Sequence, residues 1–126
     1  MRYLLDSSFV IDLLRAVPAA LSRLDELHAS GDDPIVSSVT TSEVWSGRRL
    51  GSEATIETAL RFYEYVHPGP STARVAGEWR AKAREAGRIL DTPDALIAAT
   101  AFDLDAVVLT RNVRDFELTP VRIETY

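Results

Sequence analysis

Five short stretches of the chain, rich in branched or aromatic residues and bounded by polar or turn-forming ones, have the pattern of β-strands. Between them lie segments whose apolar residues recur every three or four positions, which is the spacing of an amphipathic helix. Strands are predicted at residues 2–6, 35–39, 65–67, 106–110 and 121–123. Helices are predicted at residues 9–14, 18 to about 30, 40 to about 50, 52–62, 71–86 and 92–102.

This order of strands and helices predicts an α/β fold. Strands separated by helices form a parallel sheet with helices on both faces, through right-handed crossovers. We therefore expect residues 1–126 to form one three-layer α/β/α domain around a central, mostly parallel sheet of four to five strands. The chain shows no internal repeat, low-complexity tract or linker.

The last long helix is predicted to be buried, because it is apolar on nearly every side after its first turn. Thr92 is the expected cap, Pro93 suits the first helical position, and Asp94 falls in the first turn. An unpaired carboxylate beside an apolar stripe is costly. Asp94 therefore either caps its own helix or binds something cationic.

The composition narrows the candidate chemistry. The chain has no cysteine, which excludes disulfides, zinc-thiolate sites and thiol nucleophiles and agrees with a reducing cytoplasm. His28 and His67 are far apart and lack a metal-ligand spacing. The apolar run that ends at Asp6 is too short for a signal sequence, and no run approaches transmembrane length. We therefore expect a cytoplasmic protein that does not associate with a membrane.

The charge balance is acidic, with a net charge of −5. Taken alone, this value argues against a nucleic-acid partner. However, all the basic residues except Lys82 are arginines, which suit bidentate contacts to phosphate. If some of the acids bind divalent cations, the net charge of the remaining residues is also close to zero. The acidic composition therefore does not exclude RNA.

Four acids lie where polar groups gather in such a fold. Asp6 ends the first predicted strand, and Glu43 and Asp94 lie near helix starts. Asp115 follows the strand at residues 106–110, which has the clearest strand pattern in the chain. Each also has a purely structural interpretation: a turn at Asp6, a capping box between Thr40 and Glu43, a helix dipole at Asp94, and a solvated Asp115. Because ligands bind outside the carboxyl ends of parallel strands, we expect the acids to meet there.

A site that contains several carboxylates and neither histidine nor cysteine suits hard cations. Mg²⁺ and Mn²⁺ prefer oxygen ligands and retain bound waters. Such ions can activate water and stabilise the leaving oxygen at a phosphate. The predicted reaction is therefore hydrolysis of a phosphodiester.

The same acids lie in four segments that resemble the PIN-domain family, and more narrowly the VapC-type toxins of bacterial toxin–antitoxin pairs. The resemblance runs through the whole chain in the family's order. Its segments are Leu5-Asp6-Ser7-Ser8, Ser37-Ser38-Val39-Thr40-Thr41-Ser42-Glu43-Val44, Pro93-Asp94-Ala95-Leu96-Ile97-Ala98-Ala99-Thr100-Ala101 and Val108-Leu109-Thr110-Arg111-Asn112-Val113-Arg114-Asp115-Phe116.

The resemblance implies a Mg²⁺-dependent endoribonuclease, with Mn²⁺ as an alternative ion. It further implies a homodimer that its cognate antitoxin inhibits by reaching into the acidic groove, in a heterotetramer or larger complex. Asp6, Glu43 and Asp94 match the family's three catalytic, metal-binding acids, and Asp115 matches the more variable fourth. Ser8 departs from the family's usual asparagine, so a hydrogen bond that steadies the site is weaker or made differently.

Other residues near the acids have two interpretations. Asp12 and Asp91 are not assigned as ligands, because Asp12 lies further along its helix and Asp91 precedes the expected cap. Arg111 is either an RNA phosphate contact or a solvated arginine in a weak surface pair. The same two interpretations apply to Arg48, Arg49 and Arg114, where a contact to RNA phosphate is the less favoured one. Trp45 and Trp79 are predicted to make core or dimer contacts rather than to stack on bases.

Three other functions compete with a toxin. A phospho-accepting signalling domain would need a lysine after its last-but-one strand, whereas Lys82 lies inside a predicted helix. A binding protein of the same fold with an inactive site is disfavoured because all four acids are present. An RNA-processing nuclease without an antitoxin would be distinguished only by the absence of an adjacent small gene or co-purifying partner.

Overall fold

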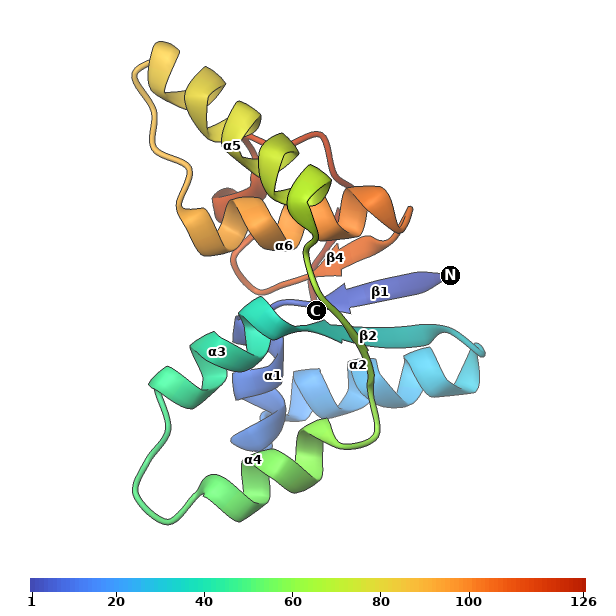
Figure 1. Cartoon of the computed structure of the whole chain (residues 1–126). Coiled ribbons are helices and arrows are strands. Elements are labelled where there is room, and N and C mark those ends of the chain that lie inside the picture. The colour runs from blue at the N-terminus through green and yellow to red at the C-terminus, as the bar shows by residue number, and fades with distance from the viewer.

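A five-stranded sheet forms the centre of the protein in a computed structural model that describes all of residues 1–126 (Figure 1). Its strands are β1 (Arg2–Leu5), β2 (Asp33–Ser37), β3 (Glu64–Val66), β4 (Val107–Leu109) and β5 (Ile123–Glu124), in the spatial order β3-β2-β1-β4-β5. Every neighbouring pair is parallel. The predicted fold class is therefore confirmed, and β1 is the central strand.

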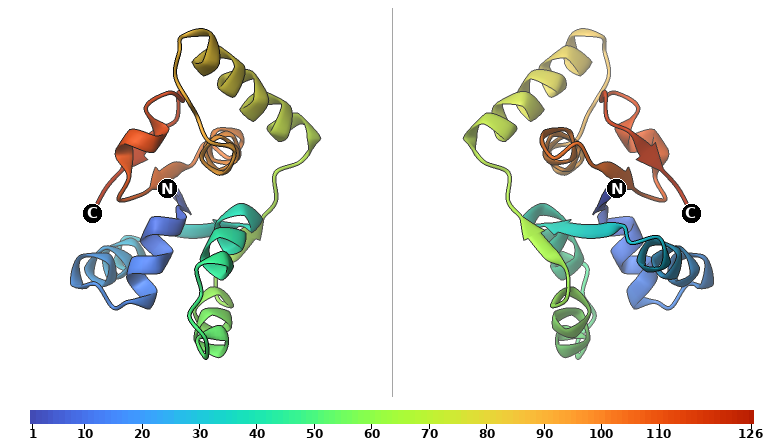
Figure 2. Two further views of the ribbon diagram at one scale, coloured as in Figure 1. Left: turned by 90° about the vertical axis from the view of Figure 1, so that its left-hand side faces the viewer. Right: turned by 90° about the vertical axis from the view of Figure 1, so that its right-hand side faces the viewer.

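Helices cover both faces of this sheet (Figure 2). They are α1 (Ser7–Leu14), α2 (Pro18–Ala29), α3 (Ser38–Ser46), α4 (Glu53–Leu60), α5 (Pro70–Glu85) and α6 (Thr92–Asp103), with a short 3₁₀ helix η1 (Val113–Phe116) after β4. Helices α1 to α4 pack on one face. Helix α6 packs on the other, and α5 lies outside α6.

Alternation along the strands assigns their side chains to these two layers. In β1, Leu5 belongs to the cluster with α1 to α4, whereas Leu4 belongs to the cluster beneath α6. In β4, Leu109 and Val108 divide in the same way. Strands buried on both faces are typical of parallel sheets, and burial of these residues positions the strand ends from which the functional side chains project.

The structure corrects two predicted helix starts. Strand β2 ends at Ser37 rather than at residue 39, and α3 begins at Ser38 with Ser37 as its N-cap. Helix α6 begins at Thr92 with Asp91 in the cap position, so the prediction of Thr92 as the cap is wrong by one residue. Both errors arise because a short run of small polar residues contains several acceptable N-cap residues, and long-range packing selects one of them.

The remaining boundaries differ from the predictions by a few residues. Helix α1 already begins at Ser7, α3 ends at Ser46, and the last strand covers Ile123–Glu124. Gly87 follows α5 with a φ of 71°, a conformation that glycine adopts without strain. None of the helices combines the length and the apolar character that crossing a bilayer requires.

Candidate metal-binding active site

Asp6 lies immediately after the central strand and is 3% exposed. Its Oδ2 atom accepts hydrogen bonds from Ser8 Oγ at 3.0 Å and from Thr110 Oγ1 at 2.7 Å. Its other oxygen, Oδ1, is buried and has no hydrogen-bond partner. The two hydroxyls therefore fix the orientation of the carboxylate and leave one oxygen available for a ligand.

Ser8 and Thr110 also organise the loop that follows β4. The Ser8 hydroxyl accepts a hydrogen bond from the Arg111 backbone N–H at 3.1 Å, and Thr110 Oγ1 accepts one from the Asn112 N–H at 2.9 Å. Ser8, the residue that departs from the family's asparagine, thus makes the steadying hydrogen bond to Asp6 through a hydroxyl. Thr110 was not predicted as a site residue, although its position as the last residue of the strand predicted at 106–110 was a usable signal.

Glu43 lies on α3, which two contacts attach to the sheet. Thr40 Oγ1 donates to the Leu5 carbonyl at 2.9 Å, and the Thr40 N–H donates to Ser37 Oγ at 3.2 Å. The predicted capping box is therefore wrong, because Ser37 caps the helix and Glu43 lies past its first turn. The Glu43 side chain takes no part in the cap and is half-buried, and its Oε1 atom is buried without a hydrogen-bond partner.

Asp94 lies in the first turn of α6 and makes no side-chain hydrogen bond or ion pair. Burial, with added repulsion from Asp115, Asp6 and Glu43, raises the pKa of Asp94 to about 7. Burial also raises the pKa of Glu43, and the charge of Asp6 adds to this increase. These carboxylates therefore lie close enough for their charges to oppose one another.

Asp115 lies on η1, whose position is fixed by the fully buried Phe116. The Asp115 residue is exposed, yet burial of its carboxyl group and the charges of Asp6 and Asp91 raise its pKa. The structure thus brings the fourth predicted acid to the same region as the other three. Figure 1 shows the geometry behind this convergence, since α1, α3 and α6 begin on the side towards which β1 and β2 point.

Asp91 joins this group, although it was left out of the predicted site. It occupies the cap position of α6, but its side chain does not cap that helix. Its charge contributes to raising the pKa values of Glu43, Asp94 and Asp115. The available signal was its position three residues before Asp94. We call Asp6, Glu43, Asp91, Asp94 and Asp115 the acidic cluster.

The carboxylate oxygens of the acidic cluster are ligands that suit a divalent cation. As the side chains are placed, no three acidic or histidine residues lie close enough together to coordinate one ion. The only buried side-chain oxygens without a partner are Asp6 Oδ1 and Glu43 Oε1, and both belong to the cluster. A hard cation would provide both with a partner.

The arginines near the cluster are mostly engaged elsewhere. Arg111 Nη1 lies 2.6 Å from Asp12 Oδ1, and Arg48 pairs with Glu53 at 3.7 Å and stacks on the Trp45 ring. Arg114 is exposed and forms no ion pair. The two tryptophans pack against the hydrophobic clusters, as predicted.

A cavity of about 340 Å³ adjoins the cluster between α3 and α6. Glu43 forms part of its wall, together with hydroxyl and apolar side chains: Ser38, Val39, Ser42, Thr92, Pro93 and Leu96. The acidic cluster is therefore bordered by a recess that can take part of a larger molecule.

The fold and the acidic cluster together define a class of protein. It is a parallel α/β domain that gathers unpaired carboxylates at the carboxyl ends of its central strands, an arrangement suited to hard cations and to phosphate chemistry.

Comparison with known proteins identifies the particular family. The PIN domain model matches residues 3–120. Ribonuclease VapC19 of Mycobacterium tuberculosis is 34% identical over 117 residues, which cover 93% of this chain and 94% of that protein. Ribonuclease VapC1 of Haemophilus influenzae is 26% identical over 123 residues. The structure of DNA-bound VapBC from Salmonella typhimurium superposes with a TM-score of 0.85 at 27% identity, covering 99% of this chain and 98% of that chain.

The chain therefore belongs to the PIN-domain family, among the relatives named Ribonuclease VapC. The predicted family resemblance is confirmed.

Proposed function

We propose that this protein is a divalent-metal-dependent endoribonuclease that acts as the toxin of a toxin–antitoxin pair. The observation that carries the proposal is the acidic cluster, in which two buried carboxylate oxygens lack any partner. The ribonuclease names of its relatives support RNA as the substrate. We also propose a cytoplasmic location, because cellular RNA is the proposed substrate.

Asp6, Glu43, Asp94 and Asp115 are the residues proposed to hold Mg²⁺, or Mn²⁺ in its place. Asp91 lies near enough to add to the negative field that attracts the ion. When bound, the ion supplies Lewis-acid chemistry, which lowers the pKa of water and offsets the charge that develops on a phosphodiester. Ser8 and Thr110 hold the Asp6 carboxylate in one orientation, so that its free oxygen needs no reorganisation when a ligand arrives.

The surroundings of the cluster suit a nucleotide chain. The recess beside Glu43 presents apolar carbon from Val39, Pro93 and Leu96, together with hydroxyl groups that can donate to a ribose or base. Arg114, exposed and unpaired beside Asp115, is available to contact phosphate. A cation at the cluster would offset the repulsion between the acids and the substrate.

The proposed partners are a cognate antitoxin and a second copy of the chain. The structures from Salmonella typhimurium and Haemophilus influenzae, named VapBC, combine a related chain with its partner, and the former is bound to DNA. We therefore expect a homodimer that assembles with the antitoxin into a heterotetramer or a larger complex.

Incubation with total RNA tests the enzymatic part of this proposal. Purified protein should produce discrete fragments with Mg²⁺ or Mn²⁺ and none with excess chelator, and mapping of the fragment ends should show cuts at internal positions. Asp94→Asn is the matched inactive control. Cleavage that persists equally in chelator would rule out the metal-dependent mechanism.

Expression tests the biological part. Induction of the wild-type protein should arrest growth, and co-expression of the antitoxin should restore it. An active enzyme whose expression is harmless would instead indicate an RNA-processing nuclease.

A further inference from the structure

One buried charge near the active site has no part in the proposed chemistry. Asp12 lies on α1, and its side chain is 5% exposed. Its Oδ1 atom accepts a hydrogen bond from Arg111 Nη1 at 2.6 Å, and its Oδ2 atom accepts one from the Tyr126 hydroxyl at 2.6 Å. Both oxygens of this buried carboxylate are therefore satisfied, whereas Asp6 and Glu43 each have one buried oxygen without a partner.

The two partners of Asp12 come from separate segments of the chain. Arg111 belongs to the loop that follows β4, whereas Tyr126 follows the edge strand β5. The Tyr126 ring packs edge-on against Phe9, with centroids 4.8 Å apart. Asp12 thus connects α1, the β4 loop and the segment after β5.

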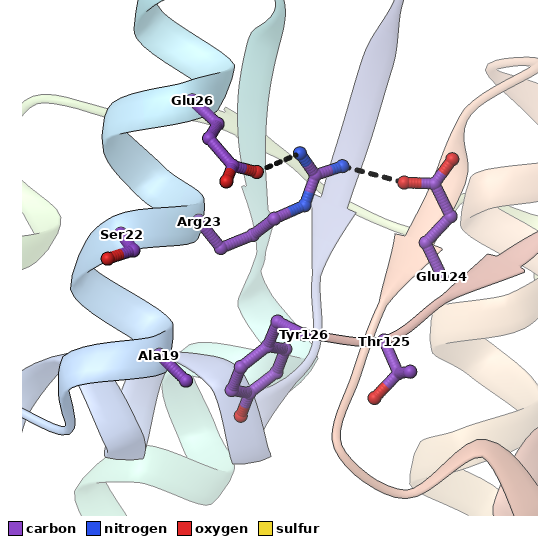
Figure 3. Close-up of a pocket in the computed structure, with 7 residues that line it drawn as sticks. All are labelled: Ala19, Ser22, Arg23, Glu26, Glu124, Thr125 and Tyr126. Atoms are coloured by element: carbon purple, nitrogen blue, oxygen red, sulfur yellow. Dashed lines mark hydrogen bonds and ion pairs between the residues drawn. The ribbon is translucent and has the colours of Figure 1, made fainter.

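The edge strand is itself anchored, which gives Tyr126 a defined position. Arg23 on α2 pairs with Glu124 at 2.6 Å and with Glu26 at 3.1 Å. Figure 3 shows Arg23 between these two carboxylates, with Tyr126 lining the same cavity of about 450 Å³. The guanidinium also lies 5.3 Å from the centre of the Tyr3 ring. These contacts attach the last residues to the body of the domain.

The loop that Asp12 holds through Arg111 is also the loop that orients Asp6. Thr110 donates to Asp6 Oδ2, and the Arg111 backbone N–H donates to Ser8 Oγ, which in turn donates to the same Asp6 oxygen. The side chain of Arg111 is therefore fixed to Asp12 while its backbone supports the hydrogen bonds of Asp6. A path of direct contacts runs from Tyr126 through Asp12, Arg111 and Ser8 to Asp6.

We propose that Asp12, Arg111 and Tyr126 form a positioning network that fixes the β4 loop, and through it the metal-binding orientation of Asp6. This inference rests on the proposed function, because it assigns a task to residues around that same site. It differs from the prediction of Arg111 as an RNA contact. Without the ion pair the loop is free to shift, and Asp6 Oδ2 loses the Thr110 hydroxyl, one of the two that hold it. The other, Ser8 on α1, loses its contact to the Arg111 backbone.

The two roles of Arg111 lead to different measurements. A phosphate contact contributes to substrate binding, so its loss raises KM and reduces the salt dependence of RNA binding. A positioning residue acts on the metal site, so its loss lowers kcat and weakens metal binding while KM stays unchanged. Metal affinity can be measured without RNA and does not depend on turnover.

The test compares Arg111→Met and Tyr126→Phe with the wild type. Calorimetric titration with Mn²⁺ should show affinity reduced by about tenfold in Arg111→Met and by a smaller factor in Tyr126→Phe. The cleavage assay should show a matching fall in kcat at constant KM. Arg61→Met, which removes an exposed arginine without an ion pair, is the matched control and should bind Mn²⁺ as the wild type does.

Folding is checked by circular dichroism, because Arg111→Met leaves a buried carboxylate without its cation. If that variant unfolds, Tyr126→Phe and the double variant Asp12→Asn/Arg111→Met carry the test, since neither leaves that carboxylate charged and without its arginine. Wild-type Mn²⁺ affinity in folded Arg111→Met and Tyr126→Phe, or a raised KM at unchanged kcat, would overturn the network. A wild type that binds Mn²⁺ but cleaves no RNA would contradict the proposed function alone.

Discussion

At the scale of single residues, hydrogen-bond partners distinguish Asp6, an acid proposed for the metal site, from Asp12, which is not. Asp6 is in the N-cap position of α1, and Asp12 lies further along the same helix. Both are almost fully buried. Both oxygens of Asp12 have protein donors, whereas one oxygen of Asp6 has none. Because leaving a buried acceptor without a partner is costly, the free oxygen of Asp6 indicates a ligand site.

Replacement of Asp94 by asparagine should separate activity from stability. Asp94→Asn removes one of several mutually repelling charges, so the metal-free variant should be at least as stable as the wild type. Its RNA cleavage should fall by about 100-fold or more, because a group proposed to hold the ion is lost. Urea denaturation and a cleavage assay measure the two effects. Asp25→Asn, an exposed acid on α2, is the control, and full activity in Asp94→Asn would remove Asp94 from the mechanism.

The raised pKa of Asp94 also predicts how stability depends on pH. With a pKa of about 7 in the folded state and an ordinary value of 3.8 when unfolded, this carboxyl group takes up a proton on folding between these pH values. Its contribution is therefore greatest below about pH 4 and is lost as pH rises through 7. In chelator, the free energy of unfolding should fall by about 1–2 kcal/mol from pH 5 to pH 8, allowing for partial exposure. Asp94→Asn should show a smaller fall, and an equal fall would contradict the assignment.

At the scale of elements, the starts of α3 and α6 determine where the acids point. Because α3 begins at Ser38, Glu43 lies on its second turn and faces the cluster instead of closing the cap. Because α6 begins at Thr92, Asp91 and Asp94 both lie at the helix end nearest the other acids. The positive end of the α6 dipole also favours negative charge at this position.

The cap of α3 can be tested with adjacent serines. Ser37→Ala removes the hydroxyl that accepts the Thr40 N–H and should destabilise the protein by about 1 kcal/mol. Ser38→Ala is the matched control, because Ser38 is already helical and makes no side-chain hydrogen bond to the helix start. Chemical denaturation of both variants measures the difference. A larger loss in Ser38→Ala than in Ser37→Ala would show that the cap lies elsewhere.

At the scale of the whole molecule, the strand order assembles the site. Strand β1 lies between β2 and β4, so the segments that follow these three strands meet at one edge of the sheet. Helix α6 packs on the other face of the sheet from α1 to α4, and the left view of Figure 2 shows it end-on above α3. Asp94 in its first turn lies close enough to Asp6 and Glu43 for their charges to raise its pKa. Residues separated by more than a hundred positions, such as Asp6 and Thr110, are thereby in direct contact.

Metal binding should therefore stabilise the entire fold. Millimolar Mg²⁺ or Mn²⁺ should raise the melting temperature of the wild type, by an amount equivalent to about 2.7 kcal/mol when the ion is at 100 times its Kd. The double variant Asp6→Asn/Asp94→Asn should respond much less. Differential scanning calorimetry with and without the ion makes the comparison. The same increase in both proteins would place the bound ions outside the acidic cluster.

The local pattern of the chain was sufficient to predict much of this architecture. Periodicity located every strand and α-helix to within a few residues, although not the short 3₁₀ helix η1, because alternation and helical spacing follow from which face of each element is buried. The position of Asp6 after a strand and of Asp94 at the start of a buried helix followed from the same reasoning. Glu43 near a helix start and Asp115 after a strand were identified from their positions as well, and the family motifs then matched all four acids.

What the sequence by itself determined is therefore the order of the elements, the parallel α/β class and the four acids proposed for the site. Only the tertiary structure decided that Ser37 and Asp91 take the cap positions, that Asp91 adds its charge to the site, and that Arg111 pairs with Asp12. These features depend on contacts between distant segments, as between Asp12 and Tyr126, which are 114 positions apart. Local propensity does not encode such contacts, because they exist only once the strands are ordered and the helices packed.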